Sequence, residues 1–165
     1  MLWNEFRAVG PLPTARFDHH VPGELRGVMH GARNITTCVA EVFQGTRVVD
    51  RLSDDRCFTA FALTRAVRLL DLTGDWPTRA GASQAISSGP RPRAQAWARV
   101  IYDAYPKVDG LWYPSSMHGG HPAVLMFERA ASAVPPDPEL DVPLSHPGLL
   151  PDLIRAAGAV GYLLR

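Results

Sequence analysis

The sequence predicts an α+β fold in one domain that spans residues 1–165, with mixed sheets and flanking helices. Segments with the two-residue period of strands and segments with the helical period follow one another along the chain. No internal repeat and no change in composition divides the sequence. Hydrophobic residues make up 46% and charged residues 20%, which is typical of a globular chain that buries its own core.

The first predicted elements are two strands and a helix. Residues 2–9 alternate apolar and polar side chains and predict a strand, and residues 27–32 predict a second one. Asn34 is a suitable N-cap for a helix that ends at about Gln44. Glu41 lies beside the apolar stripe of this helix, so we expect its carboxylate at the edge of the core, where a cleft wall would be.

The rest of the chain continues the mixed pattern. The sequence predicts strands at 57–63, 66–72, 111–113, 123–127 and 160–164, helices at 79–88, 92–105 and 151–157, a turn at 75–77 and an extended surface segment at 132–147.

The charge and the basic residues of the chain indicate which phosphate-containing ligands it could bind. The net charge of +1, from 17 basic and 16 acidic residues, argues against direct nucleic-acid binding by bulk attraction to phosphates. All basic residues except Lys107 are arginines, which suit forked contacts with phosphates and carboxylates, although a GC-rich genome produces the same bias.

Cysteine usage and terminal composition predict a cytoplasmic protein. Cys38 and Cys57 lie in apolar runs without CxxC spacing, and we expect two buried thiols in a reducing compartment. The first residues lack the pattern of a signal peptide. No apolar run approaches the ~20 residues of a membrane span, so we expect no contact with a membrane.

Several common site motifs are missing. The sequence contains no phosphate-binding loop of the GxxxxGK type, no GxGxxG and no GxSxG. His118 and His121, with His146 further on, are a weak metal-ligand pattern that is more typical of exposed loop residues. The adjacent His19 and His20 are weaker still, because neighbouring side chains diverge, and we expect no metal.

Four short motifs, spread along the chain, carry more information. They are RFDHH from residue 16, VMHGA from residue 28, AEV from residue 40 and DGLWYPSS from residue 109. In this order, over roughly residues 3–130, they resemble the RES domain family, which is named for an Arg, a Glu and a Ser. Arg16, Glu41 and Ser115 supply these residues here. Ser115 is preferred to Ser116 because the family pattern has the serine two residues after the aromatic residue.

The resemblance implies an ADP-ribosyltransferase-like fold and the toxin half of a toxin–antitoxin pair. Members of the family deplete NAD, which is their substrate, by hydrolysis or phosphorolysis. The resemblance also implies an Xre-like antitoxin that blocks the cleft, and it is compatible with a homodimer within that complex. We expect the antitoxin to contact the basic stretch 91–93 and the loop 117–121.

The chemistry of NAD cleavage suits these residues. The nicotinamide leaves as a neutral group, so one carboxylate can suffice where ordinary glycosidases need two. Glu41 can hold a ribose hydroxyl and stabilise the developing cation, Arg16 can bind the diphosphate, and Ser115 can position either substrate or glutamate. Flat surfaces for the bases are expected from Phe17, His30 and Tyr113.

Other interpretations stay open at this point. The family often has Tyr where this chain has His30, and the His30-Gly31 pair resembles that of diphtheria-type ADP-ribosyltransferases. Transfer of ADP-ribose to a specific protein is therefore an alternative, and a non-catalytic binding module with the same fold is another. Without the resemblance, Arg16 and Glu41 would be interpreted as surface residues and Ser115 as a turn former.

Overall fold

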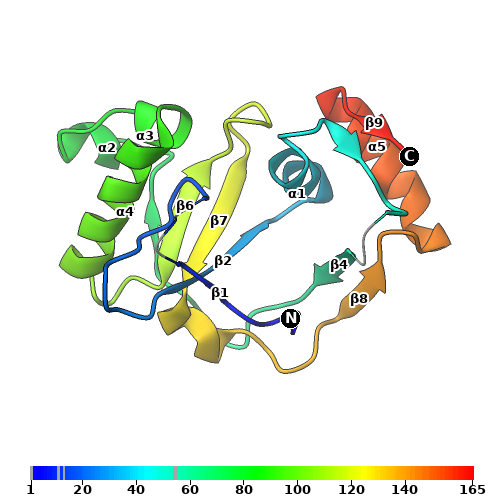
Figure 1. Ribbon diagram of the computed structural model, residues 1–165. Coiled ribbons are helices and arrows are strands. Elements are labelled where there is room, and N and C mark those ends of the chain that lie inside the picture. The colour runs from blue at the N-terminus through cyan, green and yellow to red at the C-terminus, as the bar shows by residue number, and fades with distance from the viewer. Residues whose placement is uncertain (1, 11, 13, 54–55) are drawn as a thin grey trace.

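A five-stranded sheet lies at the centre of the protein in a computed structural model, which describes residues 2–10, 12, 14–53 and 56–165 (Figure 1). In spatial order its strands are β1 (Arg7–Ala8), β2 (Gly27–Ala32), β7 (Pro122–Phe127), β6 (Gly110–Pro114) and β5 (Leu69–Asp71). All neighbouring strands pair antiparallel except β5, which runs parallel to β6. The predicted mixed α+β architecture is confirmed.

Helices flank this sheet on two sides. On one side are α2 (Trp76–Arg79), α3 (Ala85–Ser88) and α4 (Arg91–Ala104), and on the other are α1 (Ile35–Val42) and α5 (Leu150–Val160) (Figure 1). The short 3-10 helices are η1 (Glu128–Ala133) and η2 (Pro147–Leu149).

Two small sheets accompany the helices α1 and α5. β3 (Val48–Val49) pairs parallel with β9 (Leu163–Leu164), and β4 (Cys57–Ala60) pairs antiparallel with β8 (Leu140–Pro143). The segments that pair are distant in sequence, so the end of the chain packs beside elements from its first third.

The hydrophobic interior has two parts. The first lies between the central sheet and α4, where Leu111, Leu125 and Ile101 are almost completely buried. The second lies between α1 and α5, where Val39 and Leu153 are buried. Apolar burial of this kind is the main force that stabilises a fold, and it fixes α1 and the sheet as the two bodies that border the site.

The junction between β2 and α1 follows from local chemistry. β2 ends at Ala32, and Asn34 caps α1 by accepting a hydrogen bond from the Thr37 amide at 2.8 Å. The helix starts where the cap predicts, and it carries Glu41 in its second turn. This short connection fixes the position of Glu41 relative to the central sheet.

Several sequence predictions are corrected by the structure. The predicted strand at 2–9 is reduced to Arg7–Ala8, and the predicted helix at 79–88 is replaced by two one-turn helices with Gly81 at a φ of +81 between them. The predicted turn at 75–77 instead begins α2. The segment predicted as extended surface, 132–147, contributes β8 to a sheet.

Both cysteines depart from the prediction of buried thiols. Cys38 is half-buried and Cys57 is exposed on β4. Cys57 begins the short strand β4, whose pairing with β8 leaves this side chain exposed. Among the described residues, no helix has both the length and the apolar character needed to cross a membrane.

Candidate active site

A cleft of ≈ 250 Å³ lies between α1, the ends of β2 and β6, and the junction of α3 with α4. Its lining includes Arg16, His30, Glu41, Ser87, Arg91 and Tyr113. Two of the three residues that define the sequence motif, Arg16 and Glu41, thus line one cavity, although 25 positions separate them in the chain. Ser115, the third, reaches the same place through Glu41.

Ser115 holds the side chain of Glu41 by a direct hydrogen bond. The Ser115 Oγ donates to Glu41 Oε1 at 2.6 Å, and the serine is buried, with 2% of its surface exposed. The backbone amides of Met117 and His118 each donate to the same Oγ at 3.1 Å. Because a hydroxyl has two acceptor positions and one proton, these amides direct the proton of Ser115 to the carboxylate. Ser115 is thereby fixed as a donor to Glu41.

The loop that carries Ser115 is also bonded to α1. The Thr37 Oγ1 donates to Asn34 Oδ1 at 2.9 Å and lies 2.9 Å from His118 Nδ1. Since the Thr37 proton is already used, His118 Nδ1 must be the donor in this contact. The loop and the helix are therefore joined twice, at Thr37 and, one helical turn later, at Glu41.

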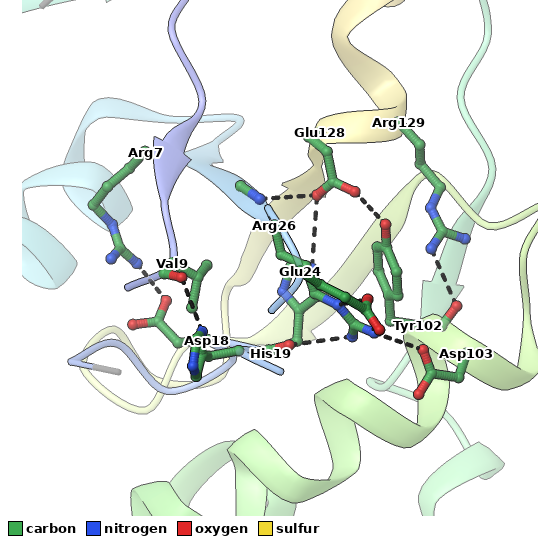
Figure 2. A network of polar contacts seen from close by, with 12 residues as sticks. Arg7, Val9, Asp18, His19, Glu24, Arg26, Tyr102, Asp103, Glu128 and Arg129 are labelled. Carbon is green, nitrogen blue, oxygen red and sulfur yellow. Dashed lines mark hydrogen bonds and ion pairs between the residues drawn. The ribbon is translucent and has the colours of Figure 1, made fainter. Parts of the chain in front are cut away.

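Arg16 is held by a network around its neighbour Asp18. The buried Asp18 carboxylate accepts hydrogen bonds from the amides of Thr14 and Ala15, each at 2.7 Å, and forms an ion pair with Arg7 of β1. Figure 2 shows this ion pair beside His19 and the Arg26 cluster. The backbone on both sides of Arg16 is thus fixed to the sheet.

Further contacts of this network, through Arg26, join the segment that carries Arg16 to α4. Arg26 forms ion pairs with Glu24 and with Asp103 of α4, and it donates to the His19 carbonyl at 3.2 Å (Figure 2). Burial raises the pKa of Glu128, but His19, the Tyr102 hydroxyl and the Gly27 amide outweigh it and lower the pKa to about 2. These contacts are structural, and they lie outside the cleft.

The Arg16 guanidinium points towards the junction of α3 with α4. Its Nη1 donates to the Gly89 carbonyl at 2.5 Å. Burial lowers the pKa of Arg16, the charge of Arg91 lowers it further, and Glu41 acts in the opposite direction. An arginine remains charged under these influences, so the cleft keeps a cation close to Glu41.

Tyr113 offers a neutral hydroxyl to the cleft. The residue is buried on β6 and packs edge-on against Phe17, with 4.9 Å between the ring centres. Burial and the Glu41 carboxylate raise the pKa of Tyr113, so the phenol keeps its proton. Burial likewise raises the pKa of Cys38, which makes this thiol unsuited to nucleophilic attack.

His30 lies on β2 and is accessible from the cleft. Desolvation by the surrounding protein lowers the pKa of His30 to about 4; the charge of Asp18 acts in the opposite direction, and that of Arg7 lowers the pKa further. The lowered pKa favours a neutral imidazole, and the ring is open to the cleft. A neutral ring can stack or accept a hydrogen bond.

The structure places the other predicted residues as follows. Phe17 is completely buried in the first core and does not line the cleft, so it does not provide the expected surface for stacking with a base. Its ring instead packs against the ring of Tyr113. Ser116 is exposed and lines the cleft, whereas Ser115 is buried behind Glu41. His118 and His121 stack at 3.9 Å, and the described residues contain no group of three side chains suited to a metal ion.

Sequence reasoning missed two residues of the cleft. Ser87 lies in a helix with no motif of its own, and Arg91 was expected only as a contact for a partner. Neither carries a local signal, because both reach the cleft through the packing of α3 and α4 against the sheet.

A larger, more apolar cleft of ≈ 780 Å³ adjoins the first one. The two share His30, Gly31, Ala32, Cys38 and Val42, so the end of β2 and one face of α1 separate them. The larger cleft is bordered by Trp3 and Phe61, whose rings lie 5.1 Å apart.

The fold and the site define a class of protein, an α+β domain in which an N-terminal arginine, a helical glutamate and a strand-end serine meet at one cleft. Among known families, the RES domain matches residues 2–145. The chain therefore belongs to the RES domain family, as its four motifs predict. Neither a curated protein nor a solved structure matches it.

Proposed function

We propose that this protein cleaves the bond between nicotinamide and ribose in NAD. The family has NAD-related enzymatic activity in general, which supports the choice of substrate. The observation that carries the proposal is the 2.6 Å hydrogen bond from Ser115 to Glu41, beside Arg16 in one cleft. It supports a carboxylate held in one orientation and close to a cation.

In the proposed reaction, Glu41 stabilises the positive charge that develops on the ribose as the bond to nicotinamide breaks. The electron pair of that bond moves to the pyridinium nitrogen, so nicotinamide leaves neutral and needs no general acid. Ser115 occupies Oε1 of Glu41, which leaves Oε2 for a ribose hydroxyl. Water or phosphate then forms the new bond to the ribose carbon.

The other residues of the cleft bind and orient the substrate. Among the described residues, the Arg16 guanidinium donates only to the Gly89 carbonyl, and its remaining N–H groups suit the diphosphate of NAD. The Tyr113 hydroxyl makes no hydrogen bond within the described part of the chain and can meet a polar group of the substrate. His30 offers a neutral ring on the opposite wall.

The first experiment measures the release of nicotinamide from NAD by the purified protein. We expect Glu41→Gln and Arg16→Ala to lower the rate at least about tenfold, because each removes a charge that the transition state uses. Unchanged release in both variants would falsify the proposal. Labelled NAD separates depletion, which gives free ADP-ribose or its phosphate, from transfer, which leaves label on a protein.

We further propose that this activity is that of a cytoplasmic toxin, neutralised by an Xre-like antitoxin that covers the cleft. Supporting this, Arg91 of the basic stretch lines the cleft, and the loop at 117–121 directly follows Ser116, which also lines it. Addition of such a partner is expected to suppress nicotinamide release in proportion to the complex formed.

A further inference from the structure

Two polar side chains at the junction of α3 with α4 have no role in the reaction described above. Ser87 is buried, with 3% of its surface exposed, and its Oγ has no hydrogen-bond partner among the described residues. The exposed side chain of Arg91 lines the same cleft and makes no hydrogen bond or ion pair with any residue that the structure describes. Buried hydroxyl groups are almost always paired in proteins, so the unpaired Ser87 hydroxyl in this cleft needs an explanation.

The charge of the cleft is also unbalanced. Its charged lining residues are Arg16, Arg91 and Glu41, which leaves an excess of one positive charge. Glu41 is already engaged by Ser115, and its single charge cannot neutralise two guanidinium groups. The cleft therefore lacks one negatively charged acceptor, although the whole chain is almost neutral.

We propose that Ser87, Arg91 and Arg16 form a subsite for a phosphate group. Two guanidinium forks match the geometry of phosphate oxygens, and the Ser87 hydroxyl supplies a further donor. Arg91 is the first residue of the 14-residue helix α4, whose first turn has no acidic residue and no side-chain cap, so the positive end of the helix dipole adds to the attraction.

The source of the phosphate rests on the proposed function. One source is the diphosphate of NAD, and the other is inorganic phosphate as the acceptor. In the second case a phosphate oxygen forms a bond to the ribose carbon, and the bond to nicotinamide breaks with its electron pair on the ring nitrogen. The products are nicotinamide and ADP-ribose phosphate, and no oxidant or further reactant is needed.

The test measures binding without turnover. Inorganic phosphate and ADP-ribose are each titrated calorimetrically into the parent protein and into Arg91→Gln, Ser87→Ala and Arg93→Gln. Arg93 is the matched control, because it lies in the same first turn of α4 and is exposed like Arg91, but it does not line the cleft. We expect Arg91→Gln to bind about tenfold more weakly and Arg93→Gln to bind like the parent.

Ser87→Ala separates a binding role from a structural one. Its hydroxyl has no partner to lose, so we expect Tm to stay the same or rise while phosphate binding weakens. Weaker binding of inorganic phosphate identifies the subsite as that of the acceptor, and weaker binding of ADP-ribose alone identifies it as that of the diphosphate. Equal affinities of all four proteins for both ligands, or no binding by the parent, would overturn the subsite. Because nicotinamide release is not measured, this result is independent of the test of the proposed function.

Discussion

At the scale of single residues, Ser115 illustrates how the backbone determines what a side chain can do. The amides of Met117 and His118 occupy both acceptor positions of its hydroxyl, and the proton is left for Glu41. A serine in this state cannot act as a nucleophile, because its oxygen has no free lone pair. Its role is to hold Glu41.

We therefore expect Ser115→Ala to affect both rate and stability. Loss of the bond to Glu41 should lower nicotinamide release about tenfold or more, and the half-buried amides of Met117 and His118 lose their acceptor at a cost of about 1–3 kcal/mol. Ser116→Ala is the matched control, since Ser116 is exposed. Kinetics and urea unfolding check both effects, and equal behaviour of the two variants would contradict the role assigned to Ser115.

His30 gives a prediction about pH. Its pKa is lowered to about 4 from the ordinary value of 6.5, so between these pH values the unfolded chain binds more protons than the folded one. The free energy of unfolding should fall as the pH drops from about 6.5 through about 4, and His30→Gln should lose less of it than the parent. An NMR titration of the ring reports the pKa directly, and a midpoint near 6.5 would be the contradicting outcome.

Individual residues differed in how far the sequence could predict them. The Asn34 cap is local, since its side chain bonds the amide three positions later, and the sequence predicts it correctly. Phe17 was assigned to the substrate only through the family motif, and burial against Tyr113 overrides that interpretation. Ser87 and Arg91 depend on long-range packing and have no local signature.

At the scale of elements, the loop after β6 and the helix α1 behave as one unit. Ser115 reaches Glu41, and His118 reaches Thr37, one helical turn earlier. Glycines at 119 and 120 have φ values of +51 and +77, which close the loop back towards β7. Two bonds to one helix restrain the loop more firmly than either alone.

Thr37→Val tests this unit. The variant keeps the shape of the side chain but removes the acceptor for His118, so we expect faster hydrogen exchange at the amides of Met117 and His118 and a lower kcat with little change in KM. Thr36, one residue earlier, bonds neither Asn34 nor His118 through its side chain, so Thr36→Val is the control. Unchanged exchange in Thr37→Val would indicate that Ser115 alone fixes the loop.

Elements with strong local signals were predicted well. The strand at 27–32 and the helix that begins after Asn34 match the structure, because two-residue and helical periods are distinct there. The sequence did not predict the pairing of β4 with β8, because the two strands lie 80 residues or more apart in the chain. The proline-rich segment that contains β8 also gives no strand pattern. The helix predicted at 79–88 is interrupted, with Gly81 at a φ of +81 between α2 and α3, and the turn predicted at 75–77 is instead the start of α2.

At the scale of the whole molecule, two cores must form before the cleft exists. The first core positions Arg16 and Tyr113, and the second positions α1 with Glu41. The second core includes α5, which lies beyond the residues matched by the family, 2–145. The last part of the chain is therefore required for the site, although it contributes no residue to the smaller cleft.

Leu153→Ala tests this dependence. Leu153 is almost completely buried in the second core, and its truncation should lower the free energy of unfolding by about 2–5 kcal/mol. Ile154→Ala is the control, because Ile154 is 55% exposed and should change stability little. Chemical denaturation, followed by fluorescence and by nicotinamide release, measures both; a Leu153→Ala protein as stable as the control would contradict this account.

The hydroxyl of Tyr162 donates to the carbonyl of Ala40, the residue that precedes Glu41, across 122 positions of the chain. During translation, Arg16 and Glu41 emerge from the ribosome long before α5 and β9 do. A nascent chain therefore holds its reactive groups without the support that assembles them. If the protein depletes NAD as proposed, we expect this activity to be absent until Tyr162 has been synthesised. A neutralising partner could bind the chain during this interval.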